Sequence, residues 1–177
     1  MSHYAFAQTF RTLYDKAIAL YADGRRGADT YFNADESAWL ASNGITAQHL
    51  YDYAEDFHGY DGDPSYDIAL GIEYIRRDFF LNVQHGKAST VVADPATWPA
   101  KDAAALGITW LPRILPKARA KLRGELPSSM MYGCGGDRNF FHTHDIHPTE
   151  FLNLIWRLDG NDAAIIDWVV RRSSGVF

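Results

Sequence analysis

The sequence predicts an all-α fold, with about seven helices in two small helical sub-structures packed together and little or no sheet. Apolar residues recur at spacings of three and four along much of the chain, which is typical of amphipathic helices. Glycine, proline and capping residues stand where these stripes begin and end. Alternating strand patterns are nearly absent, and Ser89–Val92 is the only segment that resembles a strand.

Four helices are predicted in the first half of the chain, at residues 6–21, 33–40, 46–57 and 64–83. The second begins at Asn33, where Glu36 completes the pattern of a capping box. Thr46 is a typical N-cap for the third helix. Asp63 and Pro64 predict the start of the fourth, because proline is favoured at the first helical position.

Three helices are predicted in the second half, at residues 111–122, 148–156 and 161–169. Pro112 and Pro116 cannot both lie inside a regular helix, because Pro116 has no N–H to donate to the carbonyl of Pro112. We therefore expect the regular part of this helix to begin near Pro116. Pro148 and Asn161 are favourable first residues for the other two helices.

The two halves of the chain differ in charge. Residues 1–90 carry 7 basic and 13 acidic side chains, whereas residues 91–177 carry 10 basic and 9 acidic ones. Two prolines among small residues mark the change, between Thr90 and Lys101. We therefore predict an acidic N-terminal helical sub-domain over 1–90 and a C-terminal helical sub-domain over 100–172.

The composition indicates the cellular location of the protein and the classes of partner that it binds. No stretch approaches the roughly 18 apolar residues of a membrane span, and the N-terminus shows no signal-peptide pattern. Cys134 is the only cysteine, which excludes an internal disulfide and favours a reducing compartment. The formal net charge of −5 argues against nucleic acid as the main partner. We expect a cytoplasmic protein with a small-molecule ligand and with no membrane or nucleic-acid partner.

A histidine cluster is the first candidate site. His142, His144 and His147 lie within six residues of one another, together with Asp145. Imidazole and carboxylate groups are ligands of zinc and iron, so the three histidines are candidate ligands of a divalent transition metal. The alternative is a polar loop that caps the next helix through Asp145 or His147.

Glu55 and His58 are a second pair of candidate metal ligands. Residues three apart share a helix face, which is the arrangement of the ligands in di-iron four-helix proteins. A complete site of that kind needs further carboxylates, and the sequence contains no second pair with this spacing. The alternative is a solvated acidic helix end.

A glycine-rich segment surrounds the single thiol, at residues 133–137. Glycines let backbone amides approach a ligand, and Cys134 would be a nucleophile if its pKa were lowered. The alternative is a tight turn with a half-buried thiol. The candidate catalytic residues are His142, His144, Cys134 and Asp137. Among the many aromatic residues, we expect Tyr132, Phe140 and Phe141 to lie nearest a site.

Residues 111–123 carry five basic side chains and no acidic one. Arg113 and Lys117 are four residues apart, so they form a row on a helix. With Arg119 and Tyr132 they are the candidate substrate-binding residues, because arginine makes bidentate contacts with carboxylate and phosphate groups. The alternative is a face that is solvated or paired with acidic residues of the same chain.

The stretch Gly107–Ala120, which reads GITWLPRILPKARA, resembles the signature of the bacterial family called domain of unknown function 5069. The turn at Tyr132–Cys134, Asp137 and the helix from Pro148 continue the resemblance, which covers roughly residues 100–172. The resemblance implies a small, helical, soluble bacterial module. It implies no reaction, since the family's name states that its activity is not established.

Two positions depart from the pattern expected of that family. Pro116 stands where the pattern has an aspartate, so any role that needs this carboxylate is in doubt here. The His-x-His formed by His142 and His144 is also unusual beside that pattern. These histidines indicate either a specialised function or sequence drift on a loop.

These residues are compatible with two classes of function. In the first, a metal-dependent enzyme acts on a small polar or anionic molecule in a crevice between the two halves. The histidines would then bind the metal or transfer protons, and the basic residues would hold the anion. In the second, the chain is a non-catalytic ligand-binding or protein-interaction module. Complementary charge would then join the two halves, or two copies of the chain in a homodimer.

Overall fold

The computed structural model describes residues 3–176. It contains eight α-helices in that range and one short two-stranded hairpin, which confirms the predicted all-α class. Contacts along the chain divide it into two compact units, Met1–Lys87 and Ala88–Phe177, each with a core of its own. None of the helices within residues 3–176 combines the length and the apolar character that crossing a membrane requires.

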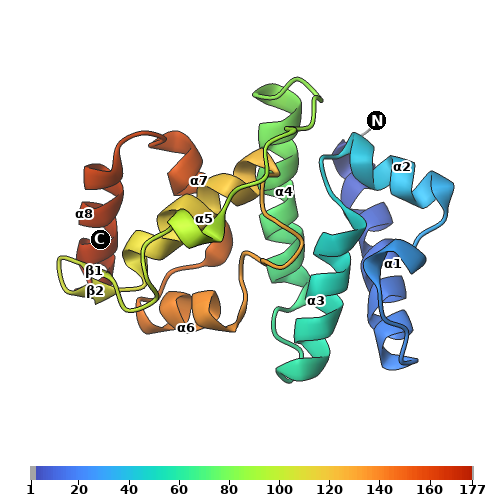
Figure 1. The fold of residues 1–177 in the computed structure, drawn as a ribbon, viewed down its shortest axis with the longest axis horizontal. Helices are drawn as coiled ribbons and strands as arrows, with labels where there is room; N and C mark the ends of the chain where they lie inside the picture. The colour runs from blue at the N-terminus through green and yellow to red at the C-terminus, as the bar shows by residue number, and fades with distance from the viewer. Residues whose placement is uncertain (1–2, 177) are drawn as a thin grey trace. The chain divides into compact units, whose positions relative to one another are not determined.

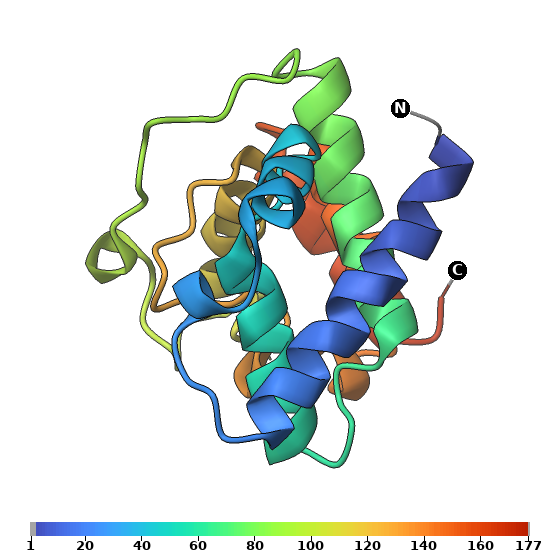
Figure 2. The same ribbon diagram turned by 90° about the vertical axis from the view of Figure 1, so that its right-hand side faces the viewer.

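The first unit is built from four α-helices and a short 3-10 helix. Helix α1 packs along α3 and also contacts α4, and Figure 1 and Figure 2 show these helices side by side. The elements in chain order are α1 (His3–Ala22), η1 (Ala28–Thr30), α2 (Ala34–Ser42), α3 (Ala47–Gly59) and α4 (Tyr66–Asn82).

Aromatic rings fill the core of the first unit. Phe6 on α1 stacks on Phe10, with ring centroids 5.7 Å apart, and on Trp39 of α2 at 5.5 Å. Tyr74 of α4 completes the group, 5.0 Å from Phe6. Phe6 and Phe10 are buried, so the apolar stripe predicted for the first helix is the face that enters the core.

The predicted helix starts are confirmed for two of the three later helices of this unit. Asn33 and Glu36 form the capping box of α2, and the Thr46 side chain caps α3. The prediction for α4 is wrong by two residues. This helix begins at Tyr66, because the hydroxyl of Ser65 accepts the backbone N–H of Ile68 and caps the helix there.

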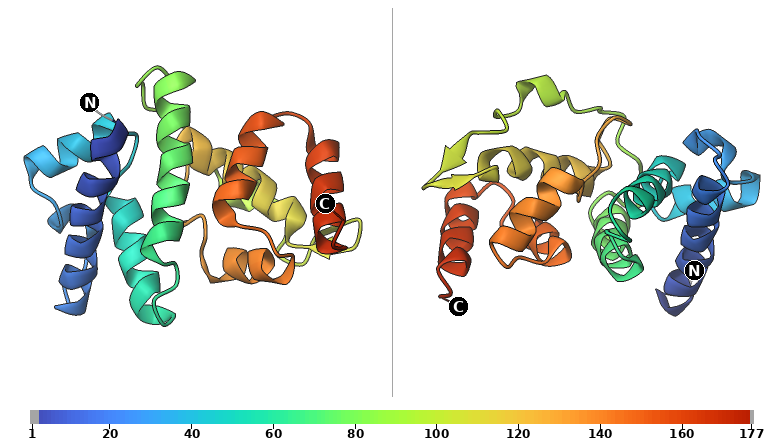
Figure 3. Two further views of the ribbon diagram at one scale, coloured as in Figure 1. Left: turned by 180° about the vertical axis from the view of Figure 1, so that it is seen from behind. Right: turned by 90° about the horizontal axis from the view of Figure 1, so that it is seen from below.

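The second unit contains the hairpin and four α-helices. Helix α5 packs on α7, and the hairpin leads directly into α5 (Figure 3). The elements in chain order are η2 (Pro95–Thr97), β1 (Ala104–Ala105), β2 (Ile108–Thr109), α5 (Leu111–Arg123), α6 (Gly135–Thr143), α7 (Pro148–Arg157) and α8 (Asp162–Ser173). The strands are antiparallel, with Ala105 opposite Ile108.

Helix α5 corrects the expectation that its regular part begins near Pro116. The helix is continuous from Leu111, with Pro112 in its first turn and Pro116 inside. Pro112 has no intrahelical N–H bond to lose at that position, so only Pro116 removes one bond from the helix. Ile114 and Ala118 are fully buried, and their packing holds the helix together across the missing bond.

Helix α6 and the hairpin were not predicted, and Ser89–Val92 is not a strand. Ser89 Oγ instead donates to Glu125 Oε1 at 2.8 Å, and the Ala93 N–H donates to the Glu125 carbonyl at 2.8 Å. These bonds tie the segment to the end of α5. The segment predicted as the junction of two sub-structures, between Thr90 and Lys101, therefore belongs to the second unit.

Candidate functional site

Asp137, in the first turn of α6, is the centre of a buried polar network. Its Oδ2 atom lies 2.6 Å from Lys117 Nζ and accepts the backbone N–H of Gly133 at 2.9 Å. Its Oδ1 atom accepts the indole N–H of Trp110 at 3.0 Å. The side chains of Lys117 and Asp137 are 2% and 0% exposed. This ion pair connects α5 to the start of α6. Loss of either partner would leave the other as a buried charge without a counter-charge.

Trp110 connects the hairpin to α5, and its indole lies against the start of α6. Its backbone is left-handed, with φ 73°, which is uncommon for a bulky residue. A Cβ atom at Gly136 would lie 2.7 Å from Cζ2 of the indole, so only glycine permits this approach. The bond to Asp137 and the contact with Gly136 therefore fix the position of the ring.

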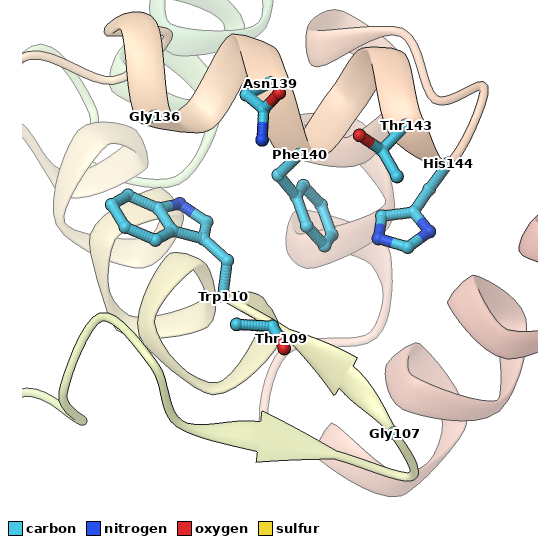
Figure 4. A pocket seen from close by; sticks show the side chains of 8 residues that line it. All are labelled: Gly107, Thr109, Trp110, Gly136, Asn139, Phe140, Thr143 and His144. Atoms are coloured by element: carbon cyan, nitrogen blue, oxygen red, sulfur yellow. The ribbon is translucent and has the colours of Figure 1, made fainter.

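The indole of Trp110 forms one wall of a pocket of about 350 Å³. Figure 4 shows the opposite wall, which is one face of α6 that carries Phe140 and His144. Residues three, four and seven positions apart share a helix face, which explains why α6 contributes so many of the lining residues. The lining residues all belong to the second unit and are Gly107, Thr109, Trp110, Gly136, Asn139, Phe140, Thr143 and His144.

The hydrogen bonds of His144 define its tautomer. Ser173 Oγ lies 2.9 Å from His144 Nδ1, and the same hydroxyl donates to the Val169 carbonyl at 2.8 Å. A hydroxyl has one proton to donate, so His144 Nδ1 is the donor in the first bond and Nε2 remains an acceptor. Burial lowers the pKa of His144, which favours this neutral form. The imidazole also packs on Phe140, with ring centroids 4.9 Å apart.

The three histidines predicted as metal ligands have different environments. His144 lines the pocket, whereas His142 is exposed near the end of α6. His147 caps α7, since its Nδ1 accepts the backbone N–H of Thr149 at 3.2 Å, as the alternative interpretation expected. Within residues 3–176, no group of three or more His, Cys, Asp or Glu side chains is arranged to hold a metal ion. A zinc or iron site at these histidines stays a prediction.

Glu55 and His58 belong to the first unit, where both contact Tyr21. The Tyr21 hydroxyl donates to Glu55 Oε1 at 3.3 Å, and the imidazole of His58 stacks on the Tyr21 ring with centroids 5.5 Å apart. His58 Nε2 also lies 3.0 Å from the carbonyl oxygen of Ile18. These contacts connect α3 to α1, so they give the pair a structural role in this unit.

The basic side chains predicted to hold a substrate anion pair with groups of the second unit. Arg113 donates to the Pro99 carbonyl at 2.7 Å, and Lys117 is buried against Asp137. Arg119 Nε lies 3.2 Å from Asp159 Oδ1, and its Nη2 contacts Asp162. None of Arg113, Lys117 and Arg119 lines the pocket, so the geometry supports the alternative of an ion-paired face.

Cys134 and Tyr132 precede α6 in the chain and contact groups other than the pocket lining. Cys134 is the N-cap of α6, and its Sγ is 3.1 Å from Lys117 Nζ. The hydroxyl of Tyr132 donates to the Pro148 carbonyl at 2.8 Å. Burial holds the pKa of Tyr132 well above its usual range, so the phenol stays protonated. Neither residue lines the pocket.

Sequence reasoning singled out Phe140, His144 and the glycine segment that contains Gly136, but it did not identify the other residues of the pocket as site residues. Phe141 is in the core, 5.8 Å from the Tyr132 ring and away from the pocket lining. Asn139 and Thr143 were missed because this segment was interpreted as a turn and loop. The spacing of Phe140, Phe141 and His144 was the available signal, since it indicates a helix with one aromatic face.

Comparison of the chain with family models, with curated proteins and with solved structures finds no match. The resemblance of residues 100–172 to domain of unknown function 5069 therefore stays a prediction that rests on its motif.

Proposed function

We propose that the second unit binds a small organic molecule in the pocket between Trp110 and His144. This is the binding-module function that the sequence left open. The observation that carries the proposal is the pocket itself. Its volume of about 350 Å³ falls within the range of small-molecule sites, roughly 300–1,000 Å³. Its walls are mostly aromatic and its rim has a few polar groups, which is the usual composition of such sites.

The support around Trp110 adds to this proposal. A bulky residue with a positive φ is strained, and such residues are enriched at functional sites. Here an ion pair, an indole hydrogen bond and a glycine all act to hold one aromatic wall in place. A binding wall that is fixed before the ligand arrives loses less entropy when the ligand binds.

The alternative of a metal-dependent enzyme has weaker support. A site made of His142, His144 and His147 would require His147 to leave the cap of α7, where its Nδ1 accepts the backbone N–H of Thr149. Within residues 3–176, no three such side chains are arranged to hold a metal ion. We therefore propose binding as the main function of this pocket, with any metal as a separate question for elemental analysis of the purified chain.

The test is an NMR screen of the full chain, labelled with ¹⁵N, against a mixed set of aliphatic, anionic and aromatic fragments. We expect bound fragments to shift the backbone amides of residues 107–110 and 136–144. Trp110→Ala should abolish these shifts. The matched control is Trp98→Ala, which removes an indole of the same unit that does not line the pocket. Shifts that map elsewhere, or that survive Trp110→Ala, would contradict the proposal.

Acid–base catalysis by His144 is a second candidate function. The observation that favours it is the neutral imidazole held by Ser173, since this form accepts a proton through Nε2. The test is to incubate each fragment that binds with the chain and to follow its conversion by NMR. His144→Asn should then stop the conversion while binding persists. Fragments that bind without being converted would leave binding as the function.

A further inference from the structure

The pocket has no charged side chain among its lining residues. The carboxylate that accepts the indole N–H, that of Asp137, is buried and lies 2.6 Å from the buried ammonium group of Lys117. They compensate one another and leave little net charge to act on a ligand. An ion that enters the pocket would lose water without gaining a counter-charge, which is unfavourable. The lining therefore selects against both anions and cations.

The faces that bound the pocket are rings. Trp110 lies on one side, and Phe140 and His144 lie together on the other, as Figure 4 shows. Aromatic rings pack on one another in stacked or edge-to-face arrangements, which are favourable in addition to the burial of their area. A flat ring uses both walls at once, whereas a puckered aliphatic ring of similar volume lacks these arrangements.

Polar side chains also line this space. The amide of Asn139 extends from α6 toward the space between Trp110 and Phe140 (Figure 4). Within residues 3–176 this amide makes no hydrogen bond. An amide offers a donor beside an acceptor, and this pattern pairs with a matching edge through two hydrogen bonds. The neutral imidazole of His144 adds one acceptor, Nε2.

We infer that the pocket binds a flat, uncharged aromatic ring that carries a hydrogen-bond donor beside an acceptor at its edge, recognised by the amide of Asn139 and held against Trp110. This inference rests on the proposed function and names the ligand class. The volume of about 350 Å³ fits one ring or two fused rings of this kind.

The experiment compares four small probes by NMR titration of the full chain. Benzamide has the flat ring and the donor beside the acceptor. Cyclohexanecarboxamide keeps the edge without the flat ring, benzoate keeps the ring with a charge, and acetophenone keeps the ring with an acceptor only. We expect benzamide to bind about fivefold or more tightly than each of the other three. Equal or tighter binding of any of the three would overturn the ligand class.

Asn139→Leu separates recognition of the edge from packing of the ring. We expect this variant to bind benzamide about fivefold more weakly and to bind benzamide and acetophenone equally, since the amide is gone. Asn82→Leu is the matched control, because Asn82 is an exposed asparagine at the end of α4 in the first unit. Unchanged benzamide affinity in Asn139→Leu would contradict the role of Asn139.

The two proposals fail in different ways. If none of the four probes and no fragment of the screen shifts residues 107–110 and 136–144, the proposed function itself is wrong. If cyclohexanecarboxamide, benzoate or acetophenone binds at these residues as tightly as benzamide does, the pocket binds small molecules and only the ligand class is wrong. Thermal unfolding of Asn139→Leu checks that the variant is folded, and we expect a melting temperature close to that of the unchanged chain because Asn139 is exposed.

Discussion

In the first unit Phe6 packs face to face on Phe10 and Trp39, and its ring is buried in the core. In the second unit Trp110 donates its N–H to Asp137 and turns a face of its indole to a pocket. Both units are rich in aromatic side chains, so aromatic content alone does not distinguish a core from a pocket wall. What distinguishes Trp110 is the buried carboxylate that fixes its indole and the glycine that lets the ring approach α6.

Removing the polar anchor of Trp110 should have the largest effect. In Lys117→Met, Asp137 would stay buried without its cation, and we expect a loss of about 3–5 kcal/mol in the free energy of unfolding. Denaturant unfolding measures this loss. Lys101→Met is the control, since Lys101 is exposed and we expect its replacement to change stability by less than about 0.5 kcal/mol. A loss below about 1 kcal/mol in Lys117→Met would show that the ion pair does not support the wall.

The next variant displaces the indole of Trp110 and leaves the ion pair of Lys117 and Asp137 in place. In Gly136→Ala the new methyl group would collide with the indole of Trp110, so we expect a stability loss of about 1–3 kcal/mol and a displaced ring. The shift of the indole N–H resonance of Trp110 and loss of fragment binding report the displacement. Gly59→Ala is the control, because a Cβ atom there meets nothing within 4 Å. An unshifted indole resonance in Gly136→Ala would be inconsistent with the packing described above.

Arg119→Ala removes an ion pair that does not support the indole of Trp110. Asp159 and Asp162, its partners, are about half exposed, and surface pairs of this kind contribute up to about 1 kcal/mol. We expect a small loss of stability that shrinks further at high salt, with fragment binding unchanged. A large loss of binding in this variant would instead support the earlier expectation that Arg119 holds a substrate.

The smallest effect concerns pH and His144. Burial lowers the pKa of His144 in the folded chain below the ordinary value of about 6.5, so the unfolded chain takes up this proton first as pH falls. The contribution of His144 to stability is therefore complete above about pH 6.5 and is lost as pH falls through that value toward the folded pKa. The free energy of unfolding, measured at pH 7.5 and 5.5, should differ less between the two pH values in His144→Gln than in the unchanged chain. His142→Gln, which changes an exposed histidine of the same helix, is the control. Equal pH effects in the two variants would contradict burial as the cause.

Much of the fold could be predicted because its determinants are local. Seven of the eight helices within residues 3–176 carry their own apolar stripe, and caps such as Asn33 and Thr46 act on the next turn of the chain. Helix α6 was missed because Gly135 and Gly136 open it, and glycine is a poor helix former. What makes glycine necessary at position 136 is the distant indole of Trp110, which no local pattern reveals.

The site was harder to predict than the fold. Lys117 and Asp137 are the kind of residues that usually lie at the surface, and only the packing of α5 against the start of α6 buries them together. The three histidines were predicted as site residues because imidazole binds metals and transfers protons, yet only His144 among them lines the pocket. Asn139 has no conspicuous pattern in the sequence. Its importance follows from its place on the same helix face as Phe140 and His144.

The left-handed backbone of Trp110 has a consequence for how this chain would evolve. Glycine adopts a φ of 73° without strain, so Trp110→Gly relieves a local conformation that Trp110→Ala does not. The backbone strain therefore favours glycine at position 110, whereas the bond of the indole to Asp137 and its packing on Gly136 favour tryptophan. Glycine at position 110 would remove one wall of the pocket, so a descendant of this protein with glycine there would lack this binding surface.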